Sequence, residues 1–132
     1  MKTTLKILSI IPARGGSKGI PMKNIKKIAN KPLIAYTIDA SLNSKVVDKT
    51  IVSTDNEKIA NIAKKYGAEI ITRPKKLSTD KMALEPVVEH VLEELNKFQN
   101  YEPDLILILQ NTSPLRNSKH VREAIQLFLE KK

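Results

Sequence analysis

The feature of this sequence that most constrains its fold is an alternation of short apolar runs with amphipathic helical patterns. The apolar runs, which predict strands, cover residues 5–11, 50–53, 68–72 and 104–109. Apolar residues recur with helical spacing over residues 32–42, 59–66, 83–96 and 118–128. Near-continuous apolar runs are typical of strands that are covered on both faces. The pattern therefore predicts a three-layer α/β fold, with a mainly parallel, Rossmann-like sheet between two layers of helices.

Local signals refine the predicted helix boundaries. Pro32 suits the first turn of a helix whose apolar face carries Leu33, Ile34, Ile38 and Leu42. For the next helix, Thr54 or Asp55 can serve as the N-cap, since Glu57 follows Thr54 at the spacing of a capping box. Asp55 is better explained as a cap than as a metal ligand. Gly67 stands where a left-handed C-terminal cap belongs. The helix over residues 83–96 is predicted to bury Leu84, Val88, Val91, Leu92 and Leu95.

The composition excludes several classes of chemistry. With 132 residues the chain has room for one domain with a real core. It has no cysteine, which excludes disulfides, thiolate metal sites and a cysteine nucleophile. The apolar run near the N-terminus is too short to span a membrane and lacks a signal-peptide cleavage region. We therefore expect a cytoplasmic protein without a membrane partner.

The net charge favours an anionic partner but decides little alone. The formal charge of +9 comes from 23 basic and 14 acidic residues, and a basic surface attracts polyanions. Only 4% of the residues are aromatic, which leaves few platforms for base stacking, and the lysines are scattered. These two features argue against nucleic acid as the main partner. Solvated helix faces rich in lysine explain the charge equally well.

The segment from Arg14 to Asn24 has the composition of a phosphate-binding loop. Directly after the first predicted strand, it places three glycines and three cations within eleven residues. Glycines allow backbone amides to approach a ligand closely, and the cations can donate charge-assisted hydrogen bonds to phosphate. The loop matches neither a Walker motif nor a dinucleotide-binding fingerprint. A flexible connection with solvated cations is the alternative, but the length, charge and position favour phosphate binding.

Two further unusual segments are predicted to meet this loop. In parallel α/β sheets, ligands bind beyond the carboxyl ends of the strands. The loops over residues 12–24, 73–82 and 110–117 all leave strands at that edge. The sequence therefore predicts one site built from three loops.

Four segments resemble the N-acylneuraminate cytidylyltransferase family, the CMP-sialic acid synthetases. Residues 11–25, which read IPARGGSKGIPMKNI, closely resemble the family's opening motif. Residues 51–55 (IVSTD), the segment from Arg73-Pro74 to Asp80, and residues 109–116 (LQNTSPLR) resemble later motifs in the same order. The resemblance covers essentially all of residues 1–132 and implies a fold of the nucleotide-diphospho-sugar transferase type. Residues 1–132 would then be the CTP-binding part of a cytidylyltransferase domain.

The family resemblance implies transfer of CMP from CTP to an acidic 2-keto sugar, with release of pyrophosphate. Arg14 and Lys23 are the implied catalytic residues, because they would neutralise charge on the leaving pyrophosphate. The positions that match nucleotide-contacting residues are Arg14, Gly15, Gly16, Ser17, Lys18, Lys23, Asn24, Arg73 and Asp80. Gln110 matches a residue that contacts the acceptor sugar. Because Gln110 follows a very apolar strand, its side chain would need a partner if it were buried.

The sequence departs from the family pattern in two respects. Asn111 stands where the family motif has proline, which leaves the acceptor preference open. The family also implies Mg²⁺, a homodimer and a longer chain. No Asp-x-Asp pair occurs in the sequence. We therefore expect the metal ligands, much of the sugar pocket and the dimerisation segment to lie in a part of the family fold beyond Lys132. We also expect the present chain to bind CTP weakly and to turn over slowly or not at all.

Several alternatives remain open from the sequence. Within the same class, the acceptor could be pseudaminic, legionaminic or 3-deoxy-manno-octulosonic acid instead of a sialic acid. A non-catalytic nucleotide-binding module is a second class of function. A basic α/β domain that binds RNA is a third. His90 and His120 are solitary on predicted helices, and neither is assigned a role.

Overall fold

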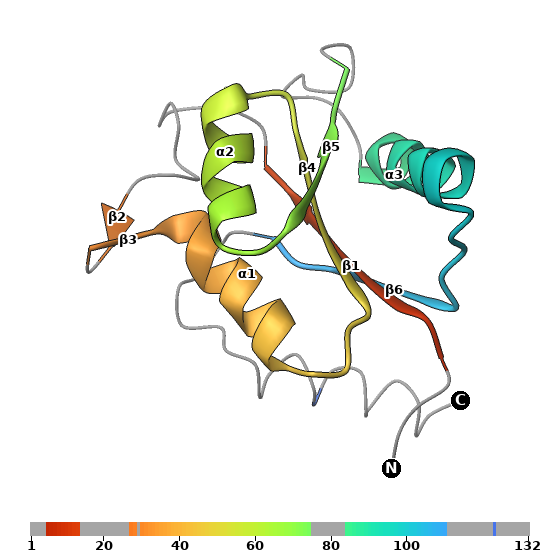
Figure 1. Ribbon diagram of the computed structural model, residues 1–132, viewed down its shortest axis with the longest axis horizontal. Helices are drawn as coiled ribbons and strands as arrows, with labels where there is room; N and C mark the ends of the chain where they lie inside the picture. The colour runs from red at the N-terminus through yellow and green to blue at the C-terminus, as the bar shows by residue number, and fades with distance from the viewer. Residues whose placement is uncertain (1–4, 14–26, 29, 75–83, 111–122, 124–132) are drawn as a thin grey trace.

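The sheet of the computed structural model has the predicted parallel arrangement. The structure describes residues 5–13, 27–28, 30–74, 84–110 and 123. Its main sheet contains β1 (Ile7–Pro12), β4 (Lys49–Thr54), β5 (Glu69–Thr72) and β6 (Leu105–Ile108). These strands are parallel and lie in the order β5-β4-β1-β6 (Figure 1). The four predicted strands are thus confirmed as one parallel sheet, whereas the predicted helix over residues 118–128 lies almost wholly outside the described residues.

Three helices cover the two faces of this sheet. They are α1 (Leu33–Asn43), α2 (Glu57–Lys65) and α3 (Leu84–Gln99). In Figure 1, α1 and α2 lie on one side of the strands and α3 lies on the other. The buried apolar residues form two clusters that follow this division, one with side chains of α1 and α2 and one with side chains of α3. The predicted three-layer arrangement is therefore confirmed for the described residues.

The position of β1 explains its nearly continuous apolar run. β1 pairs with β4 on one side and with β6 on the other. Its side chains alternate between the two faces, so Ile7 and Ile11 join the cluster of α1 and α2, whereas Leu8 and Ile10 join the cluster of α3. All four are at most 1% exposed. A strand buried on both faces needs apolar residues at consecutive positions.

A buried hydroxyl network joins α1 to the sheet. The Ser41 hydroxyl of α1 donates to Ser9 Oγ of β1 at 3.0 Å and lies 2.7 Å from Thr50 Oγ1 of β4. These three side chains are at most 5% exposed. Buried hydroxyls need such partners, and small side chains let the helix approach the strands closely. The network therefore fixes the position of α1 on its face of the sheet.

Two aspartates hold the amino-terminal end of β1. Asp48 Oδ2 accepts a hydrogen bond from the backbone N–H of Ile7 at 2.6 Å, and Asp104 Oδ2 accepts one from Lys6 at 2.8 Å. The backbone N–H groups of the same aspartates donate to the carbonyls of Ile7 and Lys6. The backbone hydrogen bonds that join β1 to β4 and to β6 therefore begin one residue before those two neighbouring strands, at Asp48 and Asp104.

Tyr101 lies close to this end of the sheet and titrates abnormally. Its ring contacts the ammonium of Lys49, whose Nζ is 5.3 Å from the ring centroid. The Oη atom is buried and has no hydrogen-bond partner among the described residues. Burial raises the pKa of Tyr101 from 10.0 to about 12, and the negative charges of Asp48, Asp104 and Glu69 add to this rise.

The raised pKa predicts a specific loss of stability in base. The unfolded chain loses the Tyr101 proton near pH 10, whereas the folded chain keeps it up to about pH 12. The free energy of unfolding should therefore fall between these two pH values. Urea denaturation of the wild type and Tyr101→Phe across this range isolates the effect, because phenylalanine cannot ionise. Equal pH dependence of the two proteins would contradict it. At neutral pH, Tyr101→Phe should cost no stability, since the hydroxyl lacks a partner among the described residues.

A small antiparallel hairpin precedes α1, where the sequence predicted only a loop. It consists of β2 (Lys27–Ile28) and β3 (Lys31–Pro32), with Asn30 at a φ of 67° in the turn. Asparagine tolerates this left-handed conformation better than most residues. Two-residue strands carry no detectable alternation, which is why sequence periodicity misses them. The hairpin ends at Pro32, which is the N-cap of α1.

The predicted cap of α2 is wrong by one or two residues. The N-cap is Asn56, whose Oδ1 accepts a hydrogen bond from the backbone N–H of Ile59 at 3.1 Å. Thr54 instead ends β4, and its hydroxyl accepts from the N–H of Asn56. Asp55 lies in the turn between these two residues. Any of the three can cap a helix, so the choice depends on where the strand ends.

Two buried faces also differ from the prediction. In α3 the most buried residues are Val87, Val91 and Leu95, whereas Leu84, Val88 and Leu92 are only partly buried. The apolar stripe of α3 is broad, so its centre is set by how the helix lies on the sheet. In α1, Leu42 was expected to be buried but is 42% exposed.

The structure confirms Gly67 as the left-handed residue that follows the C-cap of α2, and this conformation supports a stability prediction. Its φ is 103°, and a Cβ at this position would lie 3.0 Å from Leu42 Cδ1. Gly67→Ala should lower the free energy of unfolding by about 1–2 kcal/mol, mainly through the left-handed backbone. Thermal unfolding of Gly67→Ala is compared with that of the double variant Gly67→Ala/Leu42→Ala. The comparison separates the cost of the strained backbone from the cost of the close contact between the new Cβ and Leu42. Full recovery in the double variant would show that the contact, and not the backbone, carries the cost.

Candidate functional site

The carboxyl ends of the strands meet at one edge, as the sequence predicted. Backbone hydrogen bonds extend the ladders one residue past the strands there. Ala13 N–H donates to Ser53 O at 2.9 Å, Arg73 N–H to Thr54 O at 2.8 Å, and Leu109 N–H to Ile10 O at 2.9 Å. The segments that begin at Ala13, Arg73 and Leu109 therefore leave the sheet from the same edge, which confirms the predicted convergence for the described residues.

Arg73 is the candidate residue that the structure describes best. It directly follows β5 and is only 5% exposed. Its Nε–H donates to the Ser53 hydroxyl oxygen at 3.2 Å, and its Nη2 donates to the Ser53 carbonyl oxygen at 3.1 Å. A guanidinium that is buried must be hydrogen-bonded to offset its desolvation. This burial distinguishes Arg73 from an ordinary solvated cation at the end of a strand.

Ser53 is the residue at this edge that the sequence analysis did not single out. It is fully buried, on the face of β4 that α3 covers, where it receives bonds from Arg73 and from Ala13. A serine at the apolar end of a strand is a weak signal, because strand serines also occur in purely structural networks such as that of Ser9. Only the tertiary contacts separate the two cases.

Gln110 lies at the same edge but is exposed. It follows Leu109, which is 4% exposed and packs in the core cluster of α1 and α2. The argument that its amide would be buried and need a partner therefore does not apply. Its predicted contact with the acceptor sugar stays a prediction.

The other predicted site residues lie outside the described residues. They are Arg14, Gly15, Gly16, Ser17, Lys18, Lys23, Asn24 and Asp80. The structure describes the residue at which the glycine loop begins, Ala13, and the residue from which the Asp80 segment leaves, Arg73. The roles of the loop residues stay predictions, and Asn111 and His120 also lie outside this part of the chain.

Two remaining sequence candidates can be placed. His90 lies on α3, where its Nε2 is 3.8 Å from Glu94 Oε1, and the structure assigns it no role. The described residues contain no group of three or more His, Asp or Glu side chains that could hold a metal ion.

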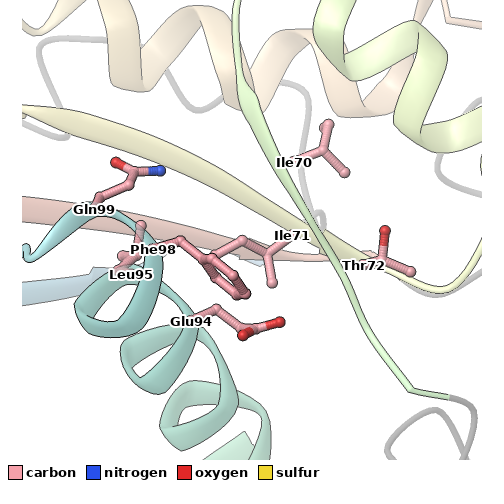
Figure 2. A pocket seen from close by; sticks show the side chains of 7 residues that line it. All are labelled: Ile70, Ile71, Thr72, Glu94, Leu95, Phe98 and Gln99. Carbon is pink, nitrogen blue, oxygen red and sulfur yellow. The ribbon is translucent and has the colours of Figure 1, made fainter.

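A cavity of about 280 Å³ lies between β5 and the carboxyl-terminal half of α3, and Thr72 at the end of β5 is one of its lining residues. Figure 2 shows Phe98 and Ile71 lining it from the two sides, with Glu94 beside them. Neither Arg73 nor Gln110 lines it. In the described part of the chain, no helix has the length and apolarity needed to cross a bilayer.

Comparison with known proteins identifies the family. The sequence profile of the Cytidylyltransferase family matches residues 8–132. The chain belongs to the cytidylyltransferase family. The resemblance stated from the sequence motifs is thereby confirmed, and with it the assignment to the nucleotidyltransferases.

Three similar cytidylyltransferases illustrate the range of acceptors among its relatives. The chain is 44% identical over 123 residues to an N-acylneuraminate cytidylyltransferase of Escherichia coli, matching 93% of this chain and 28% of that protein. It is 42% identical to the CMP-N,N'-diacetyllegionaminic acid synthase of Legionella pneumophila, matching 93% of this chain and 53% of the relative. It is also 42% identical to a pseudaminic acid cytidylyltransferase of Campylobacter jejuni, matching 96% of this chain and 54% of that protein. The chain thus spans about half or less of the length of these relatives.

Solved structures confirm the fold of this cytidylyltransferase. A CMP:2-keto-3-deoxy-manno-octonic acid synthetase complexed with CTP superposes with a TM-score of 0.74 at 25% identity, over 95% of this chain and 48% of that one. A 4-diphosphocytidyl-2C-methyl-D-erythritol synthase superposes with a TM-score of 0.70 at 14% identity, over 95% of this chain and 55% of that one. The predicted nucleotidyltransferase type of the α/β fold is therefore correct.

Proposed function

We propose that residues 1–132 form the CTP-binding part of an enzyme that transfers CMP to an acidic 2-keto sugar and releases pyrophosphate. The observation that carries this proposal is the meeting of Arg73 and the root of the glycine loop on Ser53, at the carboxyl edge of the sheet. Nucleotides bind at this edge in α/β sheets. The CTP complex of the structurally similar synthetase supports CTP as the nucleotide.

In this proposal the protein acts mainly by positioning and charge neutralisation. The anomeric hydroxyl oxygen of the sugar attacks the α-phosphorus, and the bond from that phosphorus to the bridging oxygen of the β-phosphate breaks. The hydroxyl proton leaves to solvent or base, and pyrophosphate departs with the bonding electrons. Arg14 and Lys23 neutralise charge on the departing pyrophosphate. The amides of Gly15 and Gly16, with Ser17 and Lys18, hold the triphosphate.

Arg73, Asn24 and Asp80 complete the nucleotide contacts in this proposal. Arg73 reaches the nucleotide from the end of β5, Asn24 lies near the ribose and α-phosphate, and the backbone around Asp80 faces the cytosine. Gln110 contacts the acceptor. Its exposure leaves it accessible to a second substrate.

The acceptor is proposed to be a sialic acid. The N-acylneuraminate cytidylyltransferase of Escherichia coli supports this choice, since it is 44% identical. The legionaminic and pseudaminic acid enzymes are almost as similar at 42%, so these acids are the alternative acceptors. All share a carboxylate beside the reacting anomeric carbon.

A two-part experiment tests the proposal. Calorimetric titration with CTP, UTP, ATP and GTP should show preferential binding of CTP, and equal affinities would overturn the cytidine assignment. A pyrophosphate-release assay with CTP, Mg²⁺ and a panel of acidic 2-keto sugars identifies the acceptor. Nucleotide binding without release for any sugar, both in this chain and in one extended to family length, would favour a non-catalytic module. Salt-dependent RNA binding without nucleotide selectivity would favour a polyanion-binding domain.

The family resemblance also supports a homodimer in the cytoplasm, where CTP is available. Sedimentation equilibrium of the chain, with and without CTP, tests the assembly. The same measurement on a protein of family length that contains residues 1–132 decides the question, because a monomer there would contradict the homodimer.

A further inference from the structure

The side chain of Arg73 is held by one buried serine of the neighbouring strand. Ser53 is fully buried on β4 and accepts two hydrogen bonds from one edge of the Arg73 guanidinium. One goes from Nε to the hydroxyl oxygen, and the other from Nη2 to the carbonyl oxygen. A planar group bonded at two points to one residue cannot rotate about its own axis. Ser53 therefore sets the plane of the guanidinium.

Ser53 also connects Arg73 to the segment that precedes Arg14. Its carbonyl oxygen accepts the N–H of Ala13 at 2.9 Å as well as Arg73 Nη2 at 3.1 Å. Ala13 is 1% exposed and Arg73 is 5% exposed, so water is largely excluded from this junction. Hydrogen bonds are electrostatically stronger in such an environment, and unmade ones are more costly.

We propose that Ser53 is a positioning residue for nucleotide binding, which holds the Arg73 guanidinium in its binding orientation and in register with the start of the glycine loop. The inference rests on the proposed function, since it takes Arg73 as a nucleotide contact. Ser53 itself is fully buried and acts through Arg73. Removal of the Ser53 hydroxyl removes the Nε hydrogen bond, so the guanidinium is held less firmly in this orientation.

Ser9 provides a matched control for the hydroxyl. Like Ser53, it is a fully buried serine on a neighbouring strand, and its Oγ accepts a hydrogen bond at 3.0 Å. It lies on the opposite face of the sheet, under α1. Ser9→Ala and Ser53→Ala therefore remove the same atoms and a comparable buried hydrogen bond. Only the second change touches Arg73.

The first measurement tests the contact without any nucleotide. In the wild-type protein, the Arg73 Nε–H should exchange slowly with solvent in a nitrogen-15 NMR spectrum, because it is buried and hydrogen-bonded. Ser53→Ala should accelerate this exchange at least tenfold, and Ser9→Ala should leave it unchanged. Equal exchange in the wild type and Ser53→Ala would overturn the proposed contact.

The second measurement tests the consequence for binding. CTP affinity is measured for the wild type, Ser53→Ala, Arg73→Ala and the double variant, at a temperature where circular dichroism shows all four folded. Ser53→Ala should weaken CTP binding roughly tenfold, as expected for loss of a hydrogen bond to a charged group. The same change should have little further effect once Arg73 is alanine.

The outcomes separate this inference from the proposed function. An unchanged affinity in Ser53→Ala, or an equal loss in Ser9→Ala, would show that Ser53 is only structural and would overturn the inference. A further tenfold loss in the Arg73→Ala background would also overturn it, because Ser53 would then act independently. A wild-type chain that binds no nucleotide would overturn the proposed function, while the exchange measurement still decides whether Ser53 orients Arg73.

Discussion

Replacing Arg14 with alanine is expected to lower the rate of pyrophosphate release roughly 100- to 1000-fold. This is the usual cost of removing one preorganised group that stabilises charge in a transition state. Arg14 directly follows Ala13, whose N–H is hydrogen-bonded to Ser53 at the carboxyl edge. The segment that leads into the loop therefore leaves the sheet at the carboxyl edge, where nucleotides bind in α/β sheets. Initial rates of pyrophosphate release at saturating CTP measure the effect.

Lys97→Ala is the matched control for Arg14→Ala. It removes the same unit of charge from an exposed residue in the last turn of α3, far from the carboxyl edge. A general effect of net charge on anion binding would appear in both variants, whereas a local effect would appear only at Arg14. Rates within twofold of the wild type for Arg14→Ala would remove this arginine from the mechanism.

Replacing Leu95 with alanine is expected to lower the free energy of unfolding by about 3–4 kcal/mol. Leu95 is fully buried on α3 and packs against Leu8, Ile10 and Ile51 of the sheet. The cluster under α3 contains five fully buried apolar residues, so loss of one large side chain leaves a cavity that its neighbours cannot readily fill. Such a loss is a large fraction of the stability of a small domain. Urea denaturation curves of the wild type and Leu95→Ala, fitted with one common m-value, give the difference in the free energy of unfolding.

Leu42→Ala makes the same chemical change in a different environment. Leu42 is 42% exposed on α1, so its truncation should cost less than about 1.5 kcal/mol. A similar loss in both variants would show that α3 does not cover its face of the sheet as described. A change of slope in Leu95→Ala alone would instead indicate loss of two-state unfolding.

The nature and order of the elements could be predicted from the sequence, because they depend on local patterns. A strand buried on both faces needs consecutive apolar residues, and β1 has them at all but one position from Ile7 to Ile11. Gly67 could be placed as a helix C-cap because few other residues tolerate a φ of 103°. The family motifs are likewise local strings of residues, which is why the cytidylyltransferase family is recognisable from the sequence alone.

Choices among equivalent local candidates could not be made from the sequence. Thr54, Asp55 and Asn56 are all good caps, and Asn56 takes the position because β4 continues through Thr54. The broad apolar stripe of α3 allowed several buried faces, and packing on the sheet selected Val87 over Leu84. The hairpin of β2 and β3 has strands too short to show any period.

The candidate site divides in the same way. The cationic glycine loop from Arg14, and its place after the first strand, are properties of the sequence alone, since composition and order suffice to indicate phosphate binding. The burial of Arg73 and its attachment to Ser53 were decided only by the tertiary structure. Twenty residues separate these two along the chain, and they meet because β4 and β5 pair in parallel with their carboxyl ends aligned. No local pattern records that pairing, so the sequence indicated a phosphate-binding loop, and the sheet decided which serine Arg73 contacts.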